Sequence, residues 1–105
     1  MSTKKYNKLV RDKIPDIIAS RGHNPIVQVL EEKQYIEQLV EKLYEEVEEF
    51  DEDRSVDEMA DIIEVLMALA KALDISQTEL TSVRNKKAIE RGTFKKRLFL
   101  KKVED

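Results

Sequence analysis

The sequence contains no cysteine, one histidine, two glycines and two prolines among its 105 residues. The absence of cysteine excludes disulfides, thiolate metal sites and cysteine nucleophiles. Because His23 is the only histidine, a zinc motif that needs two histidines is excluded as well. Any metal must then be held mainly by oxygen ligands, which favours Mg²⁺, Mn²⁺ or Ca²⁺ over zinc. So few glycines and prolines also argue against a β-sandwich or barrel and against a glycine-rich phosphate loop.

Long apolar runs are missing too, and we expect no signal peptide, since the first residues lack an apolar stretch of that kind. We therefore expect a cytoplasmic protein that does not bind a membrane. A length of 105 residues favours a single domain spanning residues 1–105. The composition, 41% hydrophobic and 39% charged, is typical of a helical protein with a modest core.

The net charge of −3 hides a strong partition along the chain. Residues 1–30 carry a net +4, residues 31–64 a net −12 and residues 65–105 a net +5. An acidic middle between basic ends can hold a metal cation and an anion side by side, although solvated helix faces are the simpler interpretation for most of these residues. The acidic middle and the lack of an aromatic-rich reader motif argue against binding to nucleic acid.

Hydrophobic periodicity and capping signals predict four helices, over residues 9–21, 32–52, 55–73 and 77–90. The third is apolar on nearly every side, so we expect another subunit to help cover it. We therefore predict an all-α protein, an antiparallel bundle of about four helices that assembles as a homodimer or homotetramer. A minor two-stranded β ribbon, formed by Ile26–Leu30 (IVQVL) and the basic tail at 94–103, could accompany the bundle.

Local signals mark where these helices begin and end. Pro15 suits the first turn of the first helix, with Asp12 as its cap and Gly22 after its end. Ser55 and Glu58 form an S-x-x-E capping-box pattern at the start of the third helix. The same pattern recurs at residues 76–79, before the fourth.

Acidic residues recur three apart on two successive helices. The first long helix carries two overlapping E-x-x-E pairs and the next opens with an E-x-x-D pair, namely Glu45/Glu48, Glu46/Glu49 and Glu58/Asp61. Side chains three apart lie on one helix face, roughly 5–6 Å apart at Cβ. Two such pairs on antiparallel neighbours can bring four carboxylates together, enough to hold one or two Mg²⁺ ions.

Helical angles favour one register. At about 100° per residue, Glu46 falls at the edge of the apolar stripe of its helix, Glu49 on the same side, and Glu45 nearly opposite. That stripe consists of Ile36, Leu39, Leu43, Val47 and Phe50. Glu58 lies in line with the apolar stripe of the next helix, and Asp61 borders it. A core-facing acid is costly unless it is paired or binds a metal.

Simpler interpretations remain open for several of these residues. Glu58 could serve only the capping box with Ser55, and Glu45 and Glu48 could be solvated charges. His23 suits a turn better than a ligand position. A single E-x-x-E pair is common in acidic helices, so only the paired arrangement is informative.

Four segments carry a resemblance to a known family: YNKLVRDKIPDII (6–18), LYEEVEEF (43–50), DEMADIIEVL (57–66) and KKAIERGTFKKRLFL (86–100). The two central segments resemble the E-x-x-E … E-x-x-D signature of the MazG-like all-α nucleoside triphosphate pyrophosphohydrolases. The terminal segments are similar to those of a subgroup of predicted house-cleaning nucleotide pyrophosphatases, related to phosphoribosyl-ATP pyrophosphohydrolase. The likeness covers nearly the whole chain.

This resemblance implies Mg²⁺-dependent hydrolysis of a nucleoside triphosphate between its α- and β-phosphates, with Mn²⁺ as a substitute ion. The positions that match the family's metal-binding acids are Glu46, Glu49, Glu58 and Asp61. The connector between the two pairs is shorter than is usual in the broader family, which would shift the second pair by part of a turn. The positions that match substrate-side motifs are Lys87, Arg91 and Gly92 near the nucleotide, and Lys8, Arg11, Asp12 and Lys13 in the opening motif.

Phosphoryl chemistry also needs a water aligned with the bond to be cut. A carboxylate outside the inner coordination shell could orient that water or act as general base, a role we assign to Glu45 or Glu46. Lys87 and Arg91 lie four apart on one helix face, which suits phosphate binding, or else they complement the dipole of the helix C-terminus. The alternative function is a nonenzymatic helical oligomerisation module driven by the apolar helix at 56–73.

Overall fold

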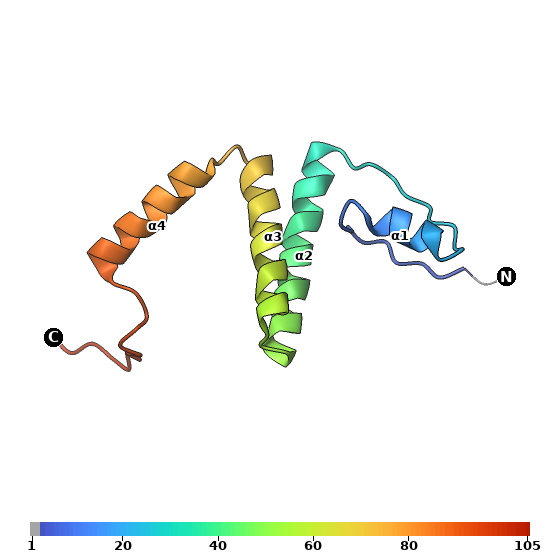
Figure 1. Ribbon diagram of the computed structural model, residues 1–105. Helices are drawn as coiled ribbons and strands as arrows, with labels where there is room; N and C mark the ends of the chain where they lie inside the picture. The colour runs from blue at the N-terminus through green and yellow to red at the C-terminus, as the bar shows by residue number, and fades with distance from the viewer. Residues whose placement is uncertain (1–2) are drawn as a thin grey trace. The chain divides into compact units, whose positions relative to one another are not determined.

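The structure, a computed structural model, describes residues 3–105 and contains four α-helices (Figure 1). These are α1 (Ile14–Ser20), α2 (Glu32–Glu52), α3 (Val56–Ala72) and α4 (Gln77–Arg91). No strand forms in this part of the chain, so the all-α prediction is confirmed. The chain divides into two compact units, one ending at Leu73 and one running from Asp74 to Asp105. A single domain over residues 1–105 stays a prediction.

The three longer helices begin and end close to the predicted residues, because local signals define them. The side chain of Ser55 caps α3 by accepting a hydrogen bond from the backbone N–H of Glu58 at 3.3 Å. Ser76 caps α4 in the same way, accepting from the N–H of Glu79 at 3.0 Å. Gly92 ends α4 with a φ of 83°, a left-handed conformation that glycine adopts without steric cost.

The first helix is shorter than predicted. It begins at Ile14 rather than at residue 9, its N-cap is Lys13, and Asp12 does not cap it. Pro15 explains the difference, because it has no N–H to donate to the carbonyl of Arg11 and its ring obstructs a preceding helical turn. Residues 3–13 therefore form an irregular segment ahead of α1.

The predicted β ribbon is not formed. Neither Ile26–Leu30 nor residues 94–103 adopt strand structure, and the side chains of Ile26 and Val29 are almost fully exposed. A two-stranded ribbon has marginal stability without further packing. β-Branched composition alone was therefore an insufficient basis for this prediction.

Helices α2 and α3 pack side by side in antiparallel orientation and form the core of the first unit (Figure 1). The buried apolar residues of the described chain are Leu39, Val65 and Ala70, and Glu46 is buried as well, with 7% of its surface exposed. The seam on α2 runs through Leu39, Leu43, Glu46 and Phe50, whereas Val47 is 49% exposed. The predicted stripe on α2 was therefore wrong by one residue at this turn, since Glu46 faces α3 where Val47 was expected to.

A second apolar face remains uncovered on the same helix pair. On α3 it includes Met59, Ile63 and Leu66, each 41–51% exposed, and on α2 it includes Val40 and Tyr44. The apolar character of α3 on nearly every side is therefore matched by burial on one side only. None of the helices in residues 3–105 combines the length and apolarity needed to cross a membrane.

Candidate metal centre

The α2–α3 hairpin places acids from both helices at one site. Only three residues separate the end of α2 from the start of α3, so the last two turns of α2 face the first two turns of α3. Glu46 lies in the former, and Glu58 and Asp61 lie in the latter. Glu58 and Asp61 are three apart and therefore project from the same face of α3.

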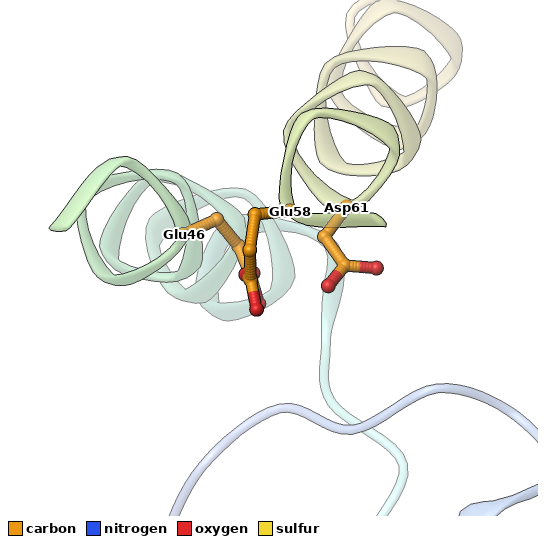
Figure 2. Close-up of side chains that lie close together, drawn as sticks. All are labelled: Glu46, Glu58 and Asp61. Atoms are coloured by element: carbon orange, nitrogen blue, oxygen red, sulfur yellow. The ribbon is translucent and has the colours of Figure 1, made fainter. Parts of the chain in front are cut away.

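These three carboxylates converge. One oxygen from each of Glu46, Glu58 and Asp61 lies within 4.8 Å of the others. Figure 2 shows the three side chains projecting to the same side of the helix pair, toward the N-terminal segment of the chain. Four acids were predicted to meet here, and the structure brings three of them into one cluster.

Two oxygens of this cluster are buried without a hydrogen-bond partner, Glu46 Oε2 and Glu58 Oε2. Burial of a charged oxygen without a partner is costly, so each of them calls for a cationic or proton-donating ligand. The capping box does not satisfy Glu58, because the N–H of Ser55 donates to the carbonyl of Asp53 at 2.7 Å rather than to the Glu58 side chain. The interpretation of Glu58 as only a capping residue is therefore disfavoured.

Burial and the repulsion between like charges make it harder to ionise two acids of the cluster. Burial raises the pKa of Glu46 above its usual value, and the nearby carboxylates of Glu49 and Asp61 raise it further, with Lys42 acting in the opposite direction. Partial burial likewise raises the pKa of Glu58, again with contributions from Glu49 and Asp61. A cation at the cluster would relieve both the desolvation and the repulsion.

Basic side chains border the acids. Arg11 Nη2 lies 2.7 Å from Asp61 Oδ1, and Lys8 Nζ lies 3.4 Å from Glu45 Oε1. Lys42 Nζ lies 3.6 Å from Glu45 Oε2 and 3.8 Å from Glu46 Oε1. The irregular N-terminal segment thus supplies two positive charges to a site whose negative charges come from α2 and α3.

A cavity of about 300 Å³ lies between this N-terminal segment and the helix pair. Its lining includes two acids of the cluster, three basic residues and two apolar ones, which are Glu46, Asp61, Lys8, Arg11, Lys42, Val10 and Ile14. This volume is at the lower end of the range for small-molecule sites. Negative and positive side chains that line the same cavity suit a ligand made of a cation and an anion.

The donor set fits a hard divalent cation. All the converging atoms are carboxylate oxygens, the ligands that Mg²⁺ and Mn²⁺ prefer. The two unpartnered buried oxygens provide sites that protein hydrogen bonds leave unused. Three carboxylates also leave coordination positions for water or phosphate, as is usual for Mg²⁺.

Other predicted site residues occupy different positions. Glu49 is exposed and is not one of the three converging acids, although it is close enough to raise the pKa of both Glu46 and Glu58. Lys13 is the exposed N-cap of α1 and does not line the cavity. Lys87 and Arg91 are exposed in the last turns of α4, within the second unit, and their proposed role stays a prediction.

Lys42 is the site residue that the sequence argument missed. Its spacing of three and four residues before Glu45 and Glu46 is the signal that could have revealed it, since such pairs are neighbours on a helix surface. Val10 and Ile14 were not singled out either, because an apolar residue in an irregular segment has no distinctive pattern.

Comparison with known proteins finds no matching family model, no matching curated protein and no matching solved structure. The resemblance to the MazG-like pyrophosphohydrolases therefore rests on the sequence motifs.

Proposed function

We propose that this protein is a Mg²⁺-dependent nucleotide pyrophosphohydrolase of the MazG-like kind, which cleaves a nucleoside triphosphate to the monophosphate and pyrophosphate. The observation that carries the proposal is the convergence of Glu46, Glu58 and Asp61 within 4.8 Å, beside a cavity also lined by Arg11 and Lys8. The buried oxygens of Glu46 and Glu58 that lack hydrogen-bond partners supply ligands for the metal, and adjacent basic residues supply ligands for phosphate. The sequence motifs supply the reaction class.

In this proposal the three converging acids hold the metal, with Glu49 as an additional ligand from the neighbouring turn. A divalent ion bound there neutralises charge on the phosphate oxygens. The α2–α3 seam fixes Glu46 by burial, and the Ser55 cap fixes the first turn of α3 that carries Glu58. Such fixed side chains minimise reorganisation when the substrate binds.

The basic side chains that line the cavity bind the phosphate chain. Arg11 presents a planar fork that matches phosphate oxygens, whereas Lys8 and Lys42 act as point charges. The other substrate-binding residues in the proposal are Lys13 at the start of α1 and, in the second unit, Lys87 and Arg91. We assign to Glu45 or Glu46 the orientation of the attacking water. Glu45 stands outside the cluster and contacts Lys8 and Lys42, while Glu46 lies within it.

The direct test is pyrophosphate release from a panel of nucleoside triphosphates with Mg²⁺. We expect Asp61→Asn to lower turnover by at least about 100-fold, because even the outer-shell partners of metal ligands contribute roughly 10–100-fold. Glu49→Gln should lower it less, since Glu49 lies beside the cluster. The matched control is Glu48→Gln, an exposed acid of the same helix whose removal should leave turnover within about twofold. Undiminished turnover in both site variants would remove the proposed site.

We also propose that the protein works as a homodimer or homotetramer. The uncovered apolar face of α2 and α3, with Met59, Ile63 and Leu66 half-exposed, favours association. Two such hairpins packed together would form a four-helix bundle.

The same face favours the alternative function, a helical interaction module without catalysis. That alternative predicts no stabilisation by ligands. A rise in melting temperature with Mg²⁺ and a nucleotide would argue against it, because a ligand that binds only the folded state stabilises that state.

A further inference from the structure

Asp61, one of the three proposed metal ligands, is already paired with a cationic side chain. Arg11 Nη2 contacts Asp61 Oδ1 at 2.7 Å, across 50 residues of sequence. The same N-terminal segment places Lys8 against Glu45. The protein's own positive charges thus lie where a divalent cation would be attracted.

A guanidinium and a divalent cation cannot share this site without cost. The guanidinium of Arg11 compensates the negative charge of Asp61, which weakens the attraction of the site for a metal. The guanidinium and the metal ion also repel each other at the short distances within the cluster. Arg11 also cannot lose its charge by deprotonation, so it must move or reduce the affinity for the metal.

The surroundings of Arg11 permit such a movement. Its side chain is 56% exposed, and its backbone belongs to the irregular segment ahead of α1. An ion pair this exposed contributes little to stability, so its loss would not unfold the segment. Arg11 also lines the 300 Å³ cavity, so its guanidinium can turn from Asp61 toward a phosphate bound in that cavity.

We propose that Arg11 is a counter-ion of the metal site, which occupies Asp61 in the metal-free protein and is released toward the cavity when a divalent cation binds. This inference rests on the proposed function and adds a coupling to it. Metal binding frees Arg11 for phosphate, and phosphate binding to Arg11 frees Asp61 for the metal. The two effects must be equal in free energy, because coupling between binding sites is reciprocal.

The chain offers a matched control for this ion pair. Arg54 Nη2 lies 2.7 Å from Asp51 Oδ1, the same contact in the same unit, but neither residue belongs to the cluster or the cavity. Removing Arg54 deletes one positive charge and one arginine–aspartate bridge without freeing a proposed metal ligand.

The first experiment measures Mn²⁺ affinity by isothermal titration calorimetry at low ionic strength, without nucleotide, for wild type, Arg11→Gln and Arg54→Gln. We expect Arg11→Gln to bind Mn²⁺ about two- to fivefold more tightly, which corresponds to the usual contribution of an exposed ion pair. Arg54→Gln should change the Mn²⁺ affinity by a smaller factor, less than half of the factor expected for Arg11→Gln. Equal affinities of wild type and Arg11→Gln overturn the inference and leave the metal site intact. No Mn²⁺ binding by wild type overturns both the inference and the proposed function.

The second experiment separates displacement of Arg11 from a general effect of charge. Wild-type protein labelled with ¹⁵N is titrated with Mg²⁺, and the side-chain Nε–Hε resonances of the arginines are followed by NMR. The Arg11 resonance is assigned by its absence in Arg11→Gln, and we expect it to shift as Mg²⁺ binds while that of Arg54 stays in place. A stationary Arg11 resonance at saturating Mg²⁺ would show that the pair persists and would overturn the inference.

Discussion

Glu46 shows how a single residue ties the stability of the protein to its proposed function. Its carboxylate is nine-tenths buried in the α2–α3 seam, and no hydrogen bond reaches Oε2. An ionised carboxylate in such a position destabilises the metal-free fold. A cation bound at the cluster would therefore stabilise the folded state, because it would compensate the buried charge of Glu46 and the charges of the two acids beside it.

This gives a prediction for the effect of pH on the metal-free protein. Because the pKa of Glu46 is raised in the folded state, that state binds more protons than the unfolded one above the ordinary value of 4.5. The free energy of unfolding should therefore fall as pH rises from about that value through the raised pKa. Glu46→Gln removes the buried charge, so it should raise stability near pH 8 and flatten this dependence. Urea unfolding from pH 5 to pH 8 in the presence of EDTA measures both effects.

Lys42 opposes the rise in the pKa of Glu46 only slightly, because its ammonium group also pairs with Glu45. The matched control is Glu48→Gln, which removes an exposed charge from the same helix and should leave the pH dependence unchanged. If Glu46→Gln instead unfolds at lower urea than wild type at pH 8, the carboxylate has a stabilising partner and the account of an unsatisfied acid is wrong.

At the scale of the element, α3 is both a structural helix and the carrier of two proposed ligands. Ser55 and Ser76 are equivalent caps, since each accepts a hydrogen bond from the N–H three residues on. Replacing either serine by alanine should cost about 1 kcal/mol of stability. Only Ser55→Ala should also weaken Mn²⁺ binding, because the first turn of α3 holds Glu58. Urea unfolding and calorimetric titration of both variants test this. Equal Mn²⁺ affinities of Ser55→Ala and Ser76→Ala would show that the Ser55 cap does not support the metal site.

The helices were predictable where local signals are sufficient. Serine caps and apolar spacing defined α2, α3 and α4 within about a residue. The predicted start of α1 was wrong because Pro15 prevents a helical turn before it. The β ribbon failed because strand pairing depends on partners distant in sequence. The acid positions followed from helical angles, but the degree of burial of Glu46 did not, since it depends on how α2 packs against α3. The contact of Arg11 with Asp61 could not be predicted, because an irregular segment has no periodicity to place its side chains.

At the scale of the whole hairpin, charge and apolar surface are segregated. By helical angle, Val40, Tyr44 and Val47 lie on one side of the α2 seam, whereas Glu45 and Glu49 lie on the other. The same division applies to α3. Its half-exposed apolar residues lie opposite the side that carries Asp61, and because the helices are antiparallel the two apolar sides coincide. The hairpin can therefore associate through one face while the proposed metal site on the other stays accessible.

This segregation predicts that association and metal binding are separable. The double variant Met59→Lys with Ile63→Lys places two charges on the apolar face, and we expect it to weaken self-association by at least about tenfold, because buried apolar side chains at the centre of an interface contribute most of its affinity. Sedimentation velocity over a range of concentrations measures the change, with Glu48→Lys as a control for added charge on an exposed position. Mn²⁺ affinity of the double variant should stay within about twofold of wild type. A wild-type protein that sediments as a monomer at all concentrations would show that this face has another partner, and lost Mn²⁺ binding in the double variant would show that the site depends on the assembled form.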